Sequence, residues 1–152
     1  MEQLLPLTLA YVGMGIMLAV SCIGSTIGVT MGGNATIGAL KKNPDMFGSA
    51  MILCALPSTQ GLYGFAGFFL MLNRLLEMPV LSLGQGFAIF AVGVGLGVVG
   101  YFSALKQASI VANGIVEMSN GQDVFGKTLI LGVFPELYAI LAFAAAFLAI
   151  PA

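Results

Sequence analysis

One carboxylate of this chain lies where a charge is costly. Six residues are acidic, and only Glu136 lies deep within an apolar segment. The other five lie at chain ends or turns: Glu2, Asp45, Glu77, Glu117 and Asp123. A charged side chain at the centre of a membrane helix costs ~2.5–3.5 kcal/mol on insertion scales, and such residues mark ion or proton pathways. Glu136 is therefore the first candidate functional residue.

Polar side chains on other segments reach the depth of Glu136. One helical face carries four residues at i, i+3, i+4 and i+7 spacing: Leu56, Thr59, Gln60 and Tyr63. This face begins about fifteen residues after the turn at 41–45. Gln107 precedes the turn at 119–123 by about a dozen residues, and Glu136 follows it by about as many. At ~1.5 Å per helical residue the groups lie at similar depths, so we expect them to converge.

The chemistry of these groups suits a small hard cation. Glu136 offers a carboxylate, Thr59 a hydroxyl, and Gln60 and Gln107 amide oxygens. An oxygen shell with one negative charge favours a monovalent cation such as Na⁺. A proton needs only one acceptor, so the extra oxygens favour Na⁺ over H⁺. The alternative is that the hydroxyl and amides only form hydrogen bonds between helices.

The elements that position these groups are apolar and long. Hydrophobic residues make up 59% of the 152 residues and charged residues 7%, whereas soluble domains carry about 25% charge. Four apolar segments, roughly 4–40, 46–73, 80–118 and 124–150, each exceed the ~20 residues that cross a bilayer. The net charge of −1 excludes a basic nucleic-acid surface, and the lack of histidine excludes histidine chemistry. The sequence predicts an all-α membrane protein with four transmembrane helices.

The four segments form a duplication with an offset of 78 residues. Residues 47–53 align with 125–131 without a gap, and Pro57 aligns with Pro135. We therefore predict two tandem helical hairpins in the same orientation, residues 1–78 and 79–152. Each proline removes a backbone N–H inside its helix, which frees a carbonyl near the polar groups. The residue that matches Glu136 in the first copy is Ser58.

The basic residues predict how the hairpins cross the membrane. Lys41 and Lys42 lie in the first turn, and Lys127 flanks the third. The middle connection has only Arg74, which Glu77 offsets. Because lysine and arginine favour the cytoplasmic side, turns 41–45 and 119–123 are predicted to be cytoplasmic and both termini outside.

Small residues predict close helix packing. Glycine or alanine recurs every four residues in the first and third segments, at Gly24, Gly28 and Gly32 and at Gly100, Ala104, Ala108 and Ala112. In lipid such stripes allow backbones to approach closely. The second and fourth segments carry the bulky side chains, at Phe65, Phe68, Phe69, Phe143 and Phe147. Thin helices inside and bulky helices outside fit a tightly curved ring of hairpins, and a compact four-helix bundle fits equally well.

The chain resembles the duplicated proteolipid, the c or K subunit, of V/A-type rotary ATPases over nearly its whole length. The most specific match is the run LPSTQGLYGF at residues 56–65, together with Gln107 and ELYAIL at 136–141. These residues are similar to the sodium-translocating branch of the bacterial enzymes.

The resemblance implies a rotor subunit in a homo-oligomeric ring in the bacterial plasma membrane. This subunit is not itself an enzyme and moves Na⁺ as the ring turns with ATP hydrolysis or synthesis. The implied Na⁺ ligands are the Leu56 main-chain carbonyl, Thr59, Gln60, Gln107 and Glu136. Tyr63 is implied to donate a hydrogen bond that locks the Glu136 carboxylate. The implied partners are membrane lipid, a stator subunit with an essential arginine, and a central-stalk subunit on the cytoplasmic turns.

Two residues depart from the family pattern. Ser58 stands where glycine is expected, and Lys106 stands beside Gln107 where a small residue is expected. Lys106 either extends toward water, as long basic side chains do, or pairs with a carboxylate. If it reached Glu136 it would compete with Na⁺.

Three other functions are the alternatives to a rotor subunit that carries Na⁺. The same rotor role with H⁺ as the coupling ion is the nearest. A small four-helix drug/proton exchanger is more distant, since it needs no duplication and would favour an aromatic-lined cavity, and the chain has no tryptophan. A purely structural four-helix protein leaves Glu136 unexplained.

Overall fold

The computed structural model describes residues 3–151, and within that range every regular element is helical. In chain order the elements are α1 (Leu4–Leu40), η1 (Pro44–Met46), α2 (Phe47–Ala55), η2 (Leu56–Ser58), α3 (Thr59–Glu77), α4 (Leu83–Ser119) and α5 (Phe125–Leu148). The all-α prediction is confirmed. Glu2 and the two chain ends, which the charge pattern places outside, fall beyond the described residues.

The predicted second span is not one continuous helix. It consists of α2, the short 3₁₀ turn η2 and α3, and η2 contains Pro57. Because proline lacks an N–H, the chain tightens there, and the Leu56 N–H bonds to the Leu53 carbonyl, which Pro57 would leave without a partner in a regular α-helix. Within the described range, only α1, α4 and α5 are each long and apolar enough to cross a membrane.

The matching proline in the second hairpin does not interrupt its helix. Pro135 lies inside the continuous α5. The residues that follow each proline explain the difference. Ser58 and Thr59 donate side-chain hydrogen bonds to backbone carbonyls three residues earlier, at 2.6 and 3.1 Å, whereas Glu136 and Leu137 have no such bond. Hydroxyls that bond the backbone locally compete with regular helical hydrogen bonding.

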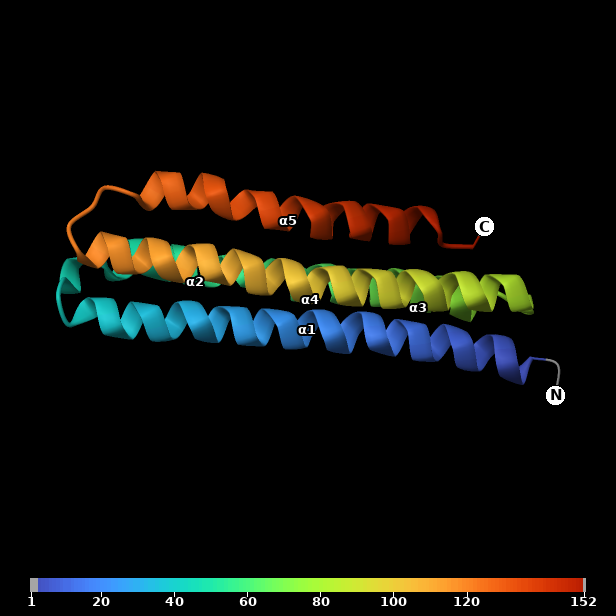
Figure 1. Cartoon of the computed structure of the whole chain (residues 1–152). Helices are drawn as coiled ribbons and strands as arrows, with labels where there is room; N and C mark the ends of the chain where they lie inside the picture. Colours follow the sequence, from blue (N-terminus) through green and yellow to red (C-terminus); the bar gives the residue numbers. More distant parts are fainter. Residues whose placement is uncertain (1–2, 152) are drawn as a thin grey trace.

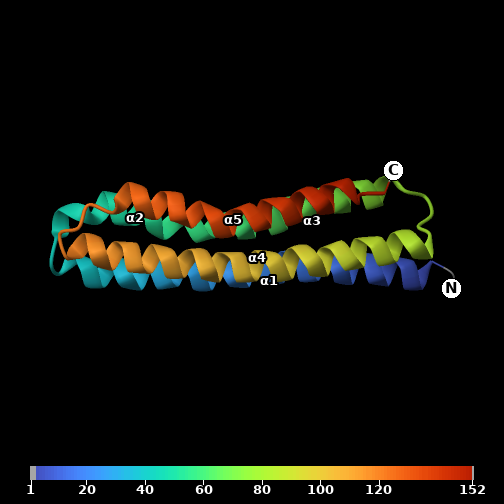
Figure 2. The same cartoon turned by 45° about the horizontal axis from the view of Figure 1, so that its top comes forward.

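The helices form two layers. Figure 2 shows α1 and α4 side by side in one layer, with α2, α3 and α5 in the other. The turns after α1 and α4 lie at the same end of the molecule, opposite the described ends of the chain (Figure 1). The Lys42 Nζ donates a hydrogen bond of 3.0 Å to Asn120 Oδ1, which joins the two turns.

Small residues bring α1 and α4 into close contact, as predicted. A Cβ atom at Gly24 would lie 2.6 Å from the Tyr101 Cα, and one at Gly28 would lie 3.1 Å from the Ala104 carbonyl oxygen. Bulky side chains of the other layer remain exposed, with Phe65 53% and Phe147 55% accessible. The small residues therefore set the spacing between α1 and α4, and phenylalanines cover the layer formed by α2, α3 and α5.

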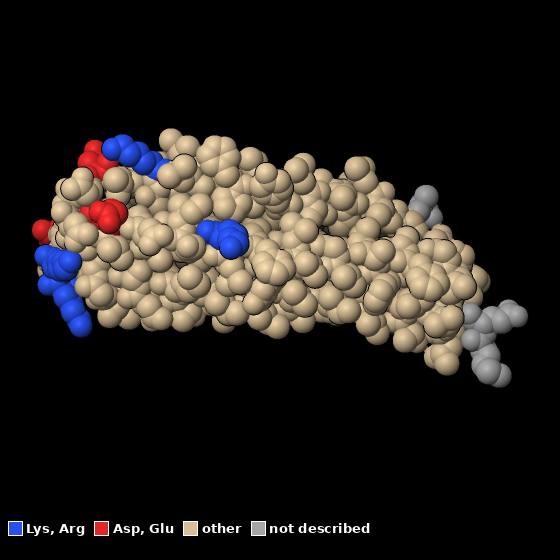
Figure 3. Space-filling model, viewed as in Figure 1, with Lys and Arg blue, Asp and Glu red and all other residues tan. Residues whose placement is uncertain are grey.

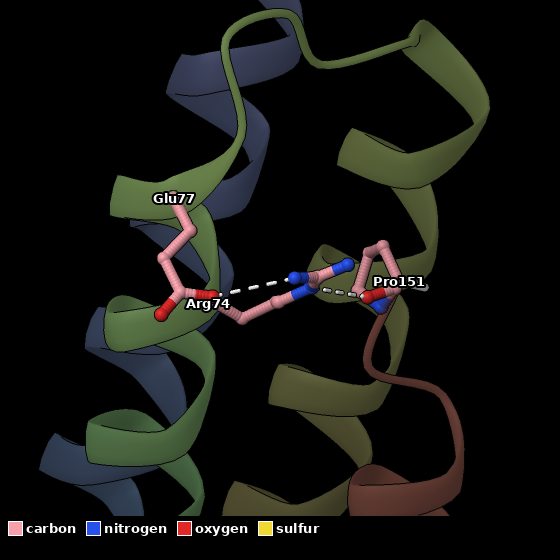
Figure 4. Close-up of polar contacts among 3 residues, drawn as sticks. All are labelled: Arg74, Glu77 and Pro151. Atoms are coloured by element: carbon pink, nitrogen blue, oxygen red, sulfur yellow. Dashed lines mark hydrogen bonds and ion pairs between the residues drawn. The ribbon is translucent and has the colours of Figure 1, made fainter.

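Charged side chains gather at one end of the face drawn in Figure 3, and one basic side chain lies midway along it. At the opposite end of the molecule, Arg74 holds two groups (Figure 4). Its Nη1 pairs with Glu77 Oε2 at 3.3 Å, and its Nε donates to the Pro151 carbonyl oxygen at 2.9 Å. Arg74 thus ties the end of α5 to the end of α3.

The core has a polar layer between two apolar clusters. One cluster includes Met17 and Leu96, and the other includes Leu53 and Val111. Between them along α1, α3 and α4 lie buried polar residues: Ser21, Ser25, Gln60, Ser103 and Gln107. Because buried polar groups require hydrogen-bond partners, this layer is the place to look for a site.

Candidate functional site

The Glu136 carboxylate lies at the edge of the polar layer and receives two hydrogen bonds. Tyr63 of α3 donates its hydroxyl to Oε1 at 2.8 Å, and Gln107 of α4 donates Nε2 to Oε2 at 3.0 Å. The Tyr63 ring also stacks on Phe143 of α5, with ring centroids 5.9 Å apart. Three helices therefore fix the position of the carboxylate.

No basic side chain of the described residues neutralises this carboxylate. Among residues 3–151 the ion pair between Arg74 and Glu77 is the only one within 4.0 Å. Lys106, which would compete with a cation if it reached Glu136, is exposed on the surface of α4 and lies outside the hydrogen-bond network. Since a carboxylate in an apolar setting requires charge compensation, it must take up a proton or a cation.

Hydrogen bonds orient both glutamine amides. The Gln107 Nε2 donates to the Gly132 carbonyl at 2.9 Å as well as to Glu136, so its Oε1 points toward Gln60. The Gln60 Nε2 donates to that oxygen at 2.9 Å and to Ser103 Oγ at 3.1 Å. Each amide oxygen has two lone pairs, so both retain capacity for a further partner.

Three oxygens gather on the other side of Gln60. The Thr59 Oγ1 lies 3.1 Å from the Leu56 carbonyl oxygen and 3.3 Å from Gln60 Oε1. The single hydroxyl proton of Thr59 is shared between two acceptors, so these three oxygens together have more lone pairs than protons. The 3₁₀ turn at Leu56–Ser58 places this carbonyl beside the Thr59 hydroxyl.

All six predicted site residues belong to one connected network. Successive hydrogen bonds run from the Leu56 carbonyl through the hydroxyl and the two amides to the carboxylate and the tyrosine: Leu56, Thr59, Gln60, Gln107, Glu136 and Tyr63. Gln60 and Gln107 are fully buried, whereas Thr59, Tyr63 and Glu136 are half-buried. The arrangement places the Glu136 carboxyl group next to a row of oxygens.

Two serines of this region were not predicted as site residues. Ser103 Oγ accepts from Gln60 and donates to the Pro135 carbonyl at 2.8 Å, so it joins α3, α4 and α5. Ser25 Oγ accepts the Gly61 N–H at 2.7 Å, near the start of α3. The two serines occupy matching positions of the duplication, and that match was the available signal.

Comparisons with known proteins agree with the duplication. The family model for the C subunit of ATP synthase matches twice, at residues 12–71 and 90–149. The chain is 36% identical over 129 residues to the V-type sodium ATPase subunit K of Enterococcus hirae, covering 84% of this chain and 81% of that protein. It is 35% identical over 135 residues to the A-type ATP synthase subunit K of Methanocaldococcus jannaschii, covering 89% of this chain but 58% of that protein.

The two stretches matched by the family model account for most of the chain, and each contains one of the prolines that align in the duplication. The second stretch contains both Gln107 and Glu136, and the first contains their partners on α3. The chain belongs to the family of the ATP synthase C subunit, in a form that contains the family unit twice.

Proposed function

We propose that this chain is a non-catalytic rotor-ring subunit of a V/A-type ATPase that carries Na⁺ on Glu136. Residues 1–78 and 79–152 form its two hairpins, which cross the membrane in the same orientation. Several copies form a ring, and the ring turns with ATP hydrolysis or synthesis. The relation to a V-type sodium ATPase subunit K supports the family role and the choice of ion.

The observation that carries the proposal is the set of groups that surround the Glu136 carboxylate. Its hydrogen-bond partners, the Tyr63 hydroxyl and the Gln107 Nε2, both act as donors, and no basic residue within 3–151 pairs with it. A carboxylate in an apolar setting requires a compensating charge, and the oxygens of Thr59, Gln60 and Gln107 in the same network are more than a proton needs. The surroundings of Glu136 therefore suit a metal cation.

The proposed Na⁺ ligands are oxygens of the network, from the Leu56 main chain, Thr59, Gln60, Gln107 and Glu136. Tyr63 is the donor that holds the carboxylate. Oxygen ligands of this kind suit hard cations. With Na⁺ bound, the site is neutral and tolerates contact with lipid. With Na⁺ released, the bare carboxylate requires a positive partner, and a stator subunit with an essential arginine would supply it.

The charged turns support the proposed orientation. Lys41, Lys42 and Lys127 lie at the end that carries the turns 41–45 and 119–123. The positive-inside rule places that end in the cytoplasm of a bacterial cell and both termini outside. A central-stalk subunit would contact the cytoplasmic turns. At ~1.5 Å per residue, the 37 residues of α1 extend well beyond a ~30 Å hydrocarbon core, which gives the stalk a protruding surface to bind.

Protection of Glu136 from a hydrophobic carbodiimide tests the choice of ion. The reagent modifies the protonated carboxyl, so bound Na⁺ should slow modification as its concentration rises at fixed pH. K⁺ at equal ionic strength is the control. If Na⁺ gives no protection across a range of pH, the same rotor role with H⁺ replaces the sodium proposal. A small drug/proton exchanger finds no support in the family match.

A further inference from the structure

The second hairpin exposes the surface that the first hairpin buries. Gly24 and Gly28 of α1 are buried where α4 packs against them. Their counterparts in the duplication, Phe102 and Lys106 of α4, are exposed, Phe102 by 56%. The first hairpin thus has a neighbour on this side, and the second hairpin has none among the described residues of the chain.

An apolar groove marks the exposed surface. It lies between α4 and α5, has a volume of about 550 Å³, and is lined by residues that include Val98, Phe102, Lys106, Leu131, Phe134 and Tyr138. In the first hairpin the counterpart of Tyr138 is Gln60, which is fully buried and bonded to α4. The groove is therefore the unfilled copy of an interface that α4 fills inside the chain.

The opposite side of the molecule carries the complementary surface. In the internal interface, Ala104 and Ala108 of α4 face the first hairpin and are fully buried. Their counterparts, Thr26 and Thr30 of α1, are exposed. Together with Ser25, Val29 and Ser58 they line a second groove of about 370 Å³, here called the hydroxyl groove.

We propose that Lys106 of one copy inserts into the hydroxyl groove of a second copy of this chain. The α4–α5 groove of the first copy would receive α1 of the next copy, as the first hairpin receives α4 within the chain. This inference rests on the proposed ring, because it assigns the surfaces by which successive copies meet. It also gives a role to Lys106, which takes no part in the ion site.

The hydroxyl groove has the polarity that an ammonium group requires. Thr26 and Thr30 each donate their hydroxyl to a carbonyl of α1 at 2.8 Å, and Ser58 donates to Ala55 at 2.6 Å. Their protons are committed, so the remaining lone pairs act as acceptors. Lysine has three donors and no acceptor, and a bare ammonium in lipid is costly.

The junction between copies would also be the counterpart of the ion site. In that position Ser58 replaces Glu136, and Val29 replaces Gln107. The carboxylate and both amides are therefore lost, because Tyr138 stands at the position that corresponds to Gln60, and Lys106 supplies a tethered cation among the hydroxyls of the hydroxyl groove. Such a junction holds its own positive charge and does not bind Na⁺.

The size of Lys106 requires a wider junction between copies than within the chain. A Cβ at its counterpart Gly28 would lie 3.1 Å from the Ala104 carbonyl oxygen and 3.4 Å from the Ala108 Cβ. A long side chain does not fit at that spacing. We therefore expect α1 and α4 to alternate around the ring between a tight contact within each chain and a wider one between chains.

Cysteine cross-linking of the purified membrane assembly tests the proposal. In a background with Cys22→Ala and Cys54→Ala, the pair Lys106→Cys and Thr30→Cys should form disulfides between chains and give a ladder of covalent multimers under mild oxidation. The matched control replaces Thr30→Cys by Thr8→Cys. Thr8 is exposed on α1 but is 22 residues away, roughly 33 Å along the helix, and should not cross-link.

Particle size separates failure of this proposal from failure of the ring. If the assembly is large but the first pair cross-links no faster than the control, the proposed contact is wrong and the ring stands. A monomeric particle would contradict the ring itself. As a second readout, Lys106→Met should raise the dissociated fraction in detergent about tenfold, and adding Thr30→Val should add little to it. Equal stability of Lys106→Met and the unmodified chain would overturn the role of the ammonium.

Discussion

Replacing Tyr63 by phenylalanine removes one of the two donors to Glu136 and little else. The hydroxyl lies 2.8 Å from Oε1, and the stacking of the ring on Phe143 needs no hydroxyl. A hydrogen bond to a charged group contributes about 1.5–3 kcal/mol. We therefore expect Tyr63→Phe to weaken Na⁺ binding by roughly 10- to 100-fold, since each 1.4 kcal/mol corresponds to a factor of ten.

The assay is the Na⁺ concentration that half-protects Glu136 from carbodiimide modification in the purified assembly. Tyr138→Phe is the matched control, because Tyr138 lies two residues from Glu136 but is 67% exposed and forms no hydrogen bond within the described range. The control should bind Na⁺ as the unmodified chain does. An unchanged half-protecting concentration in Tyr63→Phe would refute the view that the tyrosine holds the carboxylate.

Three further substitutions test other parts of the account. Glu136→Gln should abolish carbodiimide modification and Na⁺ binding while the assembly keeps its size in detergent; loss of the assembly would assign the residue a structural role instead. Ser103→Ala should weaken Na⁺ binding by about tenfold, because the buried amide of Gln60 loses a hydrogen-bond partner at a cost of about 1–3 kcal/mol. The control Ser119→Ala, at the last residue of α4 and far from the site, should have no effect on the same titration. Gly28→Ala should lower the temperature at which the chain unfolds, because a Cβ there would lie 2.7 Å from the Pro57 side chain. The control Gly38→Ala meets open space and should raise stability by about 0.5–1 kcal/mol, so equal melting temperatures of the two variants would contradict the close packing of α1.

The sequence was sufficient to predict that the candidate residues of the site lie together. Glu136 and Gln107 lie about equally far from one turn, and a helix converts that count directly into depth. The spacing of Thr59, Gln60 and Tyr63 places them on one helical face, so their convergence with the other two follows from depth and periodicity alone. Both signals are local along the chain, which is why they could be read without a structure.

The parts that the sequence did not predict depend on lateral packing. The role of Ser103 requires that α3 and α5 pass on either side of it, and no periodicity encodes that arrangement. The different effects of Pro57 and Pro135 depend on hydroxyls that follow only the first. A proline rule applied to each helix in isolation treats the two alike, so the interruption of the second span was missed.

The stoichiometry of Na⁺ binding tests the central claim most directly. The duplicated chain keeps one carboxylate at the site position, Glu136, and has Ser58 at the other. Equilibrium binding of radioactive Na⁺ to the purified assembly should therefore saturate at one ion per chain, with none bound by Glu136→Gln. Two ions per chain, or no saturable binding at any pH tested, would contradict the assignment of Glu136 as the single ion-carrying group.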